Sequence, residues 1–389
     1  MTISYYRPVA TGIVFLLLSF SFGCGLLQAR INKSAQSITT PTRETTEPVN
    51  GMSSSVDAGA DRETLAAYSS AALKAGKYAE LDQKMNDSRT TRERIPGGYW
   101  KLQAFYAGLE KPNYDKNASD SEWQAHLERL RAWKTQFPDS VNPRIALASS
   151  LTGYGWEARG GDYIDKVSDE SIRLFQSRAN EGLTELNAVK NMEPKCPEYY
   201  VVMLDIGQAL SWHGTKYENA FEEGFKFAPT YYQIPRAKVI NLLPQWSGQP
   251  GDIARFIDSV AKRIGGDEGD IIYFELASTM QPQYGSGTWR QTGLEWARAK
   301  AGFDAMKRIY GVDRYRKNLN MYFSIYSMNS LDLPNVEAAI AEVGEDWDPD
   351  VWRSRSSFEE MRNMIKQAFA TKKEFEASHP NRSGPPAQP

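Results

Sequence analysis

Residues 228–251 read APTYYQIPRAKVINLLPQWSGQPG, and this stretch decides how the chain is expected to fold. Proline suits the first turn of a helix, where its missing N–H has no partner, and it breaks a helix interior. We therefore expect one helix to end before Pro229 and a second helix to begin on it. The second helix should stop near Pro244, and after a tight turn a third should start at about Pro250. The stretch predicts a helix–turn–helix unit.

The same pattern continues towards the N-terminus. Ser119 and Glu122 have the spacing of a capping box, in which each side chain satisfies the other's backbone N–H. Asn142 and Pro143 are expected to start the next helix as its cap and first turn, and Gly160 to stop it. Between these signals apolar residues recur every three or four positions, as on one face of a helix; they are Trp123, Leu127, Leu130, Trp133 and Phe137.

Further helices are expected after Gly161. Ser168 can cap a long helix, and the apolar stripe that follows is Ile172, Phe175, Ala179, Leu183, Leu186 and Val189. Residues 201–204 read VVML and are the best strand candidate, but their helical surroundings favour a buried helix. No run of alternating apolar and polar residues is bounded by hairpin turns. The predicted fold class is therefore all-α.

The helix endings suggest a repeat. Pro194 and Pro229 are 35 residues apart, and the same step from Pro229 reaches the break at Gly265 and Gly266. Tetratricopeptide repeats have 34 residues and a proline at the end of their second helix. The step from Pro138 to Pro194 is 56, so the period is not strict, and a generic helical bundle remains an alternative. We expect antiparallel helix pairs in a right-handed, tetratricopeptide-like solenoid.

Four short segments carry a resemblance to a known kind of protein. They are Trp156-Glu157-Ala158-Arg159-Gly160, Tyr231-Tyr232, Leu243-Pro244-Gln245-Trp246-Ser247-Gly248 and Gly266-Asp267-Glu268-Gly269. Together they resemble an uncharacterised bacterial family of tetratricopeptide-like helical proteins of unknown function, over roughly residues 61–375. The resemblance implies a fold and no activity, so it supplies no catalytic residues.

The N-terminus has the features of an export signal. Arg7 precedes an apolar run at residues 9–22, and Ser21-Phe22-Gly23-Cys24 resembles a bacterial lipobox, although Ser21 and Phe22 depart from its usual pattern. This predicts a signal peptide over residues 1–24 and lipidation of Cys24. Alternatives are cleavage after Ala29 and an uncleaved anchor over residues 9–27. All three readings export the body from the cytoplasm. The adopted reading predicts a place in a bacterial cell envelope, periplasm-facing or extracellular, with attachment to the membrane by the N-terminus.

Composition divides the rest of the chain. Residues 25–60 are rich in small polar residues and lack apolar periodicity, which predicts a disordered tether. Residues 61–375 are the predicted helical domain, and the proline-rich residues 376–389 the predicted disordered tail. The formal net charge is −2, so nothing indicates nucleic-acid binding. Cys196 is the single cysteine of the body, which excludes a disulfide framework there, and a buried thiol is expected.

Motifs for reactive centres are missing from the sequence. The three histidines are His126, His213 and His379, and they form no zinc-binding pattern. His213 is expected at a helix end before Gly214. No nucleophile elbow, P-loop or dinucleotide fingerprint occurs. We therefore predict no catalytic residues, no metal and no cofactor.

Acidic clusters are expected at helix N-termini, where carboxylates stabilise the exposed N–H groups. One cluster contains Asp267, Glu268 and Asp270, and in another Asp348 is expected to cap the final helix with Pro349 in its first turn. A glycosidase pair of carboxylates could lie among such acids, but a sequence does not give their separation.

Tryptophan and arginine residues at helix ends are the candidates for a binding groove. Trp156, Arg159 and Trp246 are chosen for this role, against the alternatives of helix packing and of Arg159 bonding its own helix end. The predicted function is a scaffold or adaptor that binds an envelope protein or peptide. The alternatives are a carboxylate-dependent enzyme acting on cell-wall glycan or peptide, and a purely structural spacer.

Overall fold

The computed structural model describes residues 61–113, 118–161, 166–327 and 333–378. The chain's contacts divide it into two units, and every described helix belongs to the unit of residues 49–160 and 168–389. The predicted signal peptide with Cys24, the predicted tether and residues 379–389 lie outside the described residues. The described part contains no strand and only one isolated β-bridge, between Arg94 and Trp100. The predicted all-α fold class is thus confirmed.

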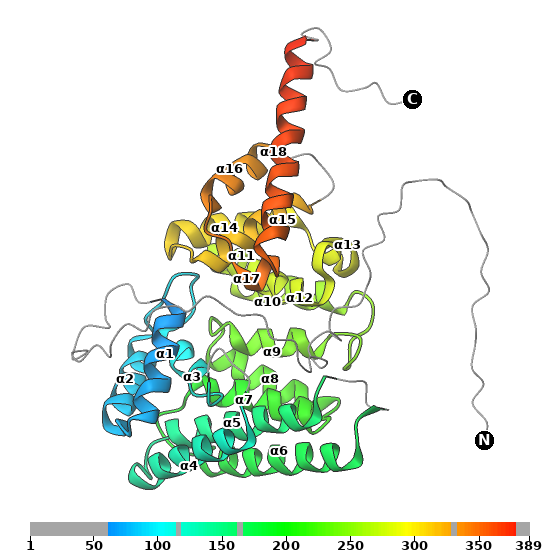
Figure 1. The fold of residues 1–389 in the computed structure, drawn as a ribbon. Coiled ribbons are helices and arrows are strands. Elements are labelled where there is room, and N and C mark those ends of the chain that lie inside the picture. Colours follow the sequence, from blue (N-terminus) through cyan, green and yellow to red (C-terminus); the bar gives the residue numbers. More distant parts are fainter. Residues whose placement is uncertain (1–60, 114–117, 162–165, 328–332, 379–389) are drawn as a thin grey trace, which may run out of the picture. The chain divides into compact units, whose positions relative to one another are not determined.

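The order of the helices along the chain can be followed in Figure 1. The first nine are α1 (Arg62–Lys74), α2 (Tyr78–Thr91), α3 (Lys101–Ala107), α4 (Asp120–Gln136), α5 (Asn142–Arg159), α6 (Asp169–Val189), α7 (Pro197–Ala209), α8 (Thr215–Phe227) and α9 (Gln233–Asn241). The rest are α10 (Asp252–Ile264), α11 (Gly266–Ser278), α12 (Gln281–Tyr284), α13 (Thr288–Thr292), α14 (Trp296–Ile309), α15 (Arg314–Ile325), α16 (Leu333–Val343), α17 (Pro349–Trp352) and α18 (Arg355–Ser378).

Many helices that follow one another in the sequence also pack together. The most extensive packing joins α5 to α6 and α11 to α14, and α4 packs on α5, α7 on α8 and α10 on α11. α7 also packs against α5 and α9, so alternate helices form a second set of contacts. Figure 1 shows α4, α5 and α6 lying side by side.

Glycines set the closest helix contacts. A Cβ added to Gly302 on α14 would lie 1.9 Å from the carbonyl oxygen of Asp270 on α11, so only glycine permits this approach. Gly108, after α3, is similarly pressed against the carbonyl of Ala66 on α1, at 2.0 Å. The apolar core that surrounds these crossings is one large cluster. Its most deeply buried large side chains include Trp133, Tyr231, Tyr273, Phe105, Phe274, Phe303, Phe323 and Phe358.

Most of the predicted helix signals are confirmed. The Ser119–Glu122 capping box is formed, Ser168 caps α6, and α5 ends at Arg159 before Gly160. Residues 201–204 lie within α7 and are buried, as expected of a helix with apolar surroundings. On α4 the predicted stripe is buried from Trp123 to Trp133.

The central stretch differs from the prediction in where its second helix lies. α8 ends at Phe227, before Pro229, but α9 runs only from Gln233 to Asn241 and α10 begins at Asp252. The reason is that Pro229 opens a turn, closed by a hydrogen bond from the Tyr231 N–H to the Ala228 carbonyl (3.0 Å), before helical bonding starts. The turn after α9 is tight, since a Cβ on Gly248 would lie 1.8 Å from the Leu242 oxygen.

Two predicted helix-end roles were wrong, and a third is correct but belongs to a different helix. Asn142 is the first residue of α5 rather than its cap, and its buried side chain bonds Asp82 and Arg89 instead. His213 lies in the turn between α7 and α8, because α7 already ends at Ala209. Asp348 caps α17, with Pro349 in its first turn, whereas the final helix α18 begins separately at Arg355.

Candidate functional site

The three residues chosen from the sequence as a candidate groove come together on the surface. Trp156 and Arg159 lie in the last turn of α5, and Trp246 lies in the turn between α9 and α10. The indole rings of Trp156 and Trp246 meet edge to face, with centroids 5.5 Å apart. The guanidinium carbon of Arg159 is 5.8 Å from each of these centroids. We call this arrangement the tryptophan–arginine cluster.

The cluster rests on apolar side chains that are separate from the main core. Phe175 on α6 and Ala209 on α7 belong to this second, small buried cluster, against which Trp156 and Leu210 pack. The ring centroids of Trp156 and Phe175 are 4.5 Å apart. Packing of this kind restricts the orientation of the Trp156 ring.

The surface of the cluster combines apolar and cationic character. Trp246 is 37% exposed, which is high for a tryptophan, and Trp156 and Arg159 are partly exposed. A guanidinium beside indole faces is attracted by the ring quadrupoles. Arg159 also donates to the Gly160 carbonyl (3.0 Å), so its alternative role at the helix end is present as well. Such a surface can bind, but it holds no group that would transfer a proton or attack a substrate.

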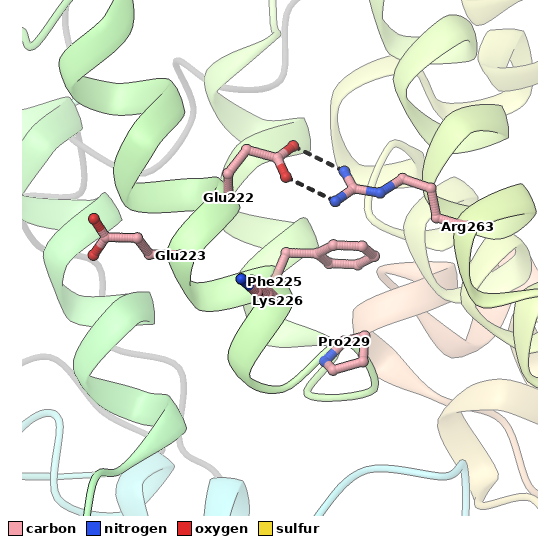
Figure 2. A pocket seen from close by; sticks show the side chains of 6 residues that line it. All are labelled: Glu222, Glu223, Phe225, Lys226, Pro229 and Arg263. Carbon is pink, nitrogen blue, oxygen red and sulfur yellow. Dashed lines mark hydrogen bonds and ion pairs between the residues drawn. The ribbon is translucent and has the colours of Figure 1, made fainter.

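A second surface feature, which sequence reasoning did not identify, is an open hollow of about 470 Å³ between α8 and α10. Figure 2 shows its six lining residues. Glu222 accepts two hydrogen bonds from the Arg263 guanidinium, at 2.8 and 2.7 Å, and that guanidinium lies 4.2 Å from the centre of the Phe225 ring. Glu222 and Arg263 are 41 residues apart, and no pattern in the sequence links them. Because these two charges satisfy each other, the hollow does not point to a reaction.

The acids predicted at the start of α11 are there, and each is held by a basic side chain. Asp267 pairs with Arg308 at 2.7 Å, Glu268 with Arg94 at 3.2 Å and Asp270 with Arg298 at 3.7 Å. Within the described ranges, no three histidine, cysteine or acidic side chains are placed to hold a metal ion. The three acidic side chains at the start of α11 therefore form ion pairs with arginines from other segments of the chain.

Sequence reasoning did not identify the buried ionisable groups. Glu198, in the first turn of α7, accepts a hydrogen bond from the Tyr231 hydroxyl at 2.6 Å. The pKa of its carboxyl is raised to about 8, chiefly by burial; the Tyr231 bond opposes this rise, and the charges of Asp205 and Glu110 contribute to it. A carboxyl in this state is largely protonated near neutral pH.

Asp205 lies two turns further along α7, and its side chain is exposed. The protein atoms around it nevertheless disfavour its charged form and raise the pKa of its carboxyl to about 7. The Glu110 carboxylate adds to the rise, whereas the Arg236 guanidinium opposes it. An exposed carboxyl that titrates near neutrality is a property that acid–base catalysts share.

The remaining histidine and cysteine candidates are structural. His126 is buried, its Nε2 lies 2.9 Å from the Leu109 carbonyl oxygen, and burial lowers its pKa to about 4. Cys196 is a buried free thiol 3.4 Å from the Tyr106 hydroxyl, and burial raises its pKa. The His126 imidazole is buried and held at a backbone carbonyl, away from any substrate in solvent, and a protonated thiol is a poor nucleophile at neutral pH. His213 is exposed in its turn.

Comparisons of this chain with protein-family models, with curated proteins and with solved structures find no match. The resemblance to tetratricopeptide-like proteins therefore stays a prediction from the sequence. No helix in the described part of the chain is long and apolar enough to cross a bilayer. The geometry of the chain's own residues is what supports a function.

Proposed function

We propose that this chain is an exported helical-repeat protein that binds an envelope protein or peptide and serves as a scaffold or adaptor. The observation that carries this proposal is the tryptophan–arginine cluster, where Trp156, Arg159 and Trp246 meet at the surface over a packed apolar base. Truncation studies of protein interfaces find the largest losses at tryptophan, tyrosine and arginine, in rigid and well-packed settings. The cluster has these residue types in that setting.

The helix packing supports the finer proposal of a tetratricopeptide-like array. Sequence neighbours such as α7 and α8 pack as pairs, and α7 also contacts α5 and α9 in the flanking pairs. Arrays of this kind offer an extended surface to which a peptide or protein docks without any catalytic group. The cluster would be one anchor point on such a surface.

Binding is tested by truncating the most exposed member of the cluster. Trp246→Ala should weaken the affinity for the partner roughly 30-fold, because loss of a hot-spot residue costs about 2 kcal/mol or more. The partner is recovered by crosslinking in membranes of the native organism, purified and titrated against the full chain by calorimetry. Ile309→Ala is the matched control, since Ile309 is 45% exposed and lies on α14, away from the cluster. Equal affinities for Trp246→Ala and the unaltered chain would contradict the proposal.

Membrane attachment through a lipid on Cys24 is part of the same proposal, with the body in a bacterial cell envelope, periplasm-facing or extracellular. It rests on the Ser21-Phe22-Gly23-Cys24 sequence after an apolar run. Metabolic labelling with a palmitate analogue should be lost in Cys24→Ala and kept in Cys196→Ala, because Cys196 is a buried thiol of the body. Labelling that persists in Cys24→Ala would refute lipidation at that position.

A second candidate function, a carboxylate-dependent enzyme acting on cell-wall glycan or peptide, is favoured by one specific observation. Asp205 is exposed and its pKa is raised to about 7, with the Glu110 carboxylate and the Arg236 guanidinium acting on it. If this carboxyl is a general acid, the full chain should degrade cell-wall fragments, and Asp205→Asn should lose that activity at least 100-fold. Absence of any turnover by the unaltered chain would remove this candidate and leave binding.

A further inference from the structure

The segment between α2 and α3, residues 92–100, contains the isolated β-bridge and leaves the helical pattern completely. Its turn is formed by Pro96, Gly97 and Gly98, and the Ile95 N–H bonds the Tyr99 carbonyl at 2.9 Å. Gly97 and Gly98 have φ of +92° and +80°, in the left-handed region that favours glycine. Most of the segment is buried, which is unusual for a connection between helices. We call residues 92–100 the strap.

Arg94 is the strap's first attachment to helices much later in the chain. Its guanidinium bonds the Thr230 carbonyl and the Glu268 carboxylate, each at 3.2 Å. Three aromatic rings surround it at 5.5–5.6 Å from their centroids; they belong to Trp100, Tyr232 and Tyr310. Glu268 also accepts hydrogen bonds from the hydroxyls of Tyr232 (2.7 Å) and Tyr310 (2.8 Å), so both of its carboxylate oxygens are hydrogen-bonded.

The second attachment lies at the turn itself. The Gly97 N–H donates to the Gly311 carbonyl at 2.9 Å, and the Tyr99 hydroxyl donates to Glu275 on α11 at 2.7 Å. Arg316 on α15 pairs with the same Glu275 and lies 4.6 Å from the centre of the Tyr99 ring. A Cβ on Gly97 would be 2.3 Å from the Arg316 guanidinium carbon, so the turn fits against this side chain only as glycine.

These contacts join residues more than 130 positions apart. In an ordinary helical repeat each unit touches its neighbours, so that stability is a sum of local terms and the ends can open by themselves. Contacts between the first helices and later ones add a stabilising free energy that is lost only when the two groups of helices separate. Its charges are mostly buried and mutually bonded, so removing one partner would leave the other uncompensated.

We propose that the strap fastens α1–α3 to α11, to the turn that follows α14 and to α15, so that the early and the late helices open in one cooperative step instead of fraying separately. The fold would then hold a fixed arrangement of its helices before any partner binds. This proposal concerns the conformation of the domain and does not depend on the binding function above.

Native-state hydrogen exchange of the full chain, read by mass spectrometry at increasing denaturant, tests the tie. Amides of α1–α3 and of α14–α15 should exchange with the same rate-limiting opening and the same denaturant dependence. Gly76→Ala is the first variant, because Gly76 has φ +68° in the turn between α1 and α2 and an added Cβ would have nothing within 4 Å. It strains α1 and α2 without touching the strap, so it should speed exchange equally in both groups.

Gly97→Ala is the second variant, and it should have the opposite signature. By displacing the turn from Arg316 it should speed exchange in α1–α3 at least tenfold more than in α14–α15. If the turn variant does not fold, Tyr99→Phe removes only the Glu275 bond and should separate the two groups by a smaller factor. Faster exchange in α1–α3 alone in Gly76→Ala, or in the unaltered chain, would overturn the proposal, as would identical exchange in both groups of both strap variants.

Discussion

At the scale of single residues, polar side chains that bond one another in the interior connect distant parts of the chain. Asn142 is fully buried and bonds Asp82, Arg89 and Tyr106, although its place before Pro143 is typical of a helix cap. These partners lie 36 to 60 residues away, and no local pattern announces them. The same holds for Glu198, whose role depends on Tyr231 from another helix pair. Local sequence patterns therefore assign such residues to the correct helix but predict the wrong structural role for them.

Glu198 yields a prediction about pH. Its carboxyl has a pKa of about 8 in the folded chain and about 4.5 when unfolded, so the folded state binds the proton more tightly. Stability from this group is complete below the unfolded value and is lost as pH rises towards 8. Glu198→Gln cannot ionise, so between pH 5 and pH 8 the unaltered chain should lose roughly 3 kcal/mol relative to the variant. Urea unfolding at several pH values measures this difference.

The control for this prediction is Glu157→Gln, which alters an exposed carboxylate near the end of α5. Its unfolding free energy should follow that of the unaltered chain at every pH. Parallel curves for Glu198→Gln and the unaltered chain would show that the Glu198 carboxyl is ionised in the folded protein.

The candidate site illustrates both sides of sequence reasoning at this scale. Trp156, Arg159 and Trp246 were chosen because large aromatic and basic residues stand at helix ends, and the structure brings these three together. Their contact across 90 residues could not be derived, since it depends on how α5 and the turn after α9 approach each other. Whether they bind a partner stays a prediction.

At the scale of secondary-structure elements, capping residues and helix-breaking residues predicted which segments are helical more accurately than they predicted the first and last residues of each helix. The capping box at Ser119 and the stop at Gly160 are correct because both depend on neighbouring residues only. The start of α9 was predicted at Pro229 but lies at Gln233. A proline in the first turn of a helix and a proline in a turn before the helix have the same local sequence. Tyr231 and Tyr232, which lie between Pro229 and the first helical residue, are buried in the core.

Helix crossings give a prediction with opposite signs at two helical glycines. Gly302→Ala should destabilise the fold by about 2–4 kcal/mol, because its Cβ would lie 1.9 Å from the Asp270 oxygen and α14 must move away from α11. Gly153→Ala on α5 should stabilise by about 0.5–1 kcal/mol, since its Cβ would make ordinary 3.6 Å contacts and alanine favours the helix. Thermal and denaturant unfolding compare the two variants. A gain in stability for Gly302→Ala would show that the two helices are not in close contact.

At the scale of the whole molecule, composition and periodicity predicted the all-α fold class, and the order of packed pairs follows the order of the sequence. The strap could not be predicted, because a Pro-Gly-Gly turn is typical of an exposed loop and the Thr230 partner of Arg94 lies 136 residues later. Such a tie makes the helices behave as one body. A binding surface on one body is preformed, which reduces the entropy lost when a partner docks.

The central claim is that the chain works by binding at the tryptophan–arginine cluster, and site-specific photo-crosslinking in the native envelope tests it most directly. A photoreactive residue replaces Trp246 in one version of the full chain and Ile309 in another, both being exposed apolar positions. We predict one dominant protein adduct from position 246, strongly reduced when Trp156→Ala and Arg159→Ala are added, and none of that adduct from position 309. The same adduct at equal yield from both positions would contradict the account.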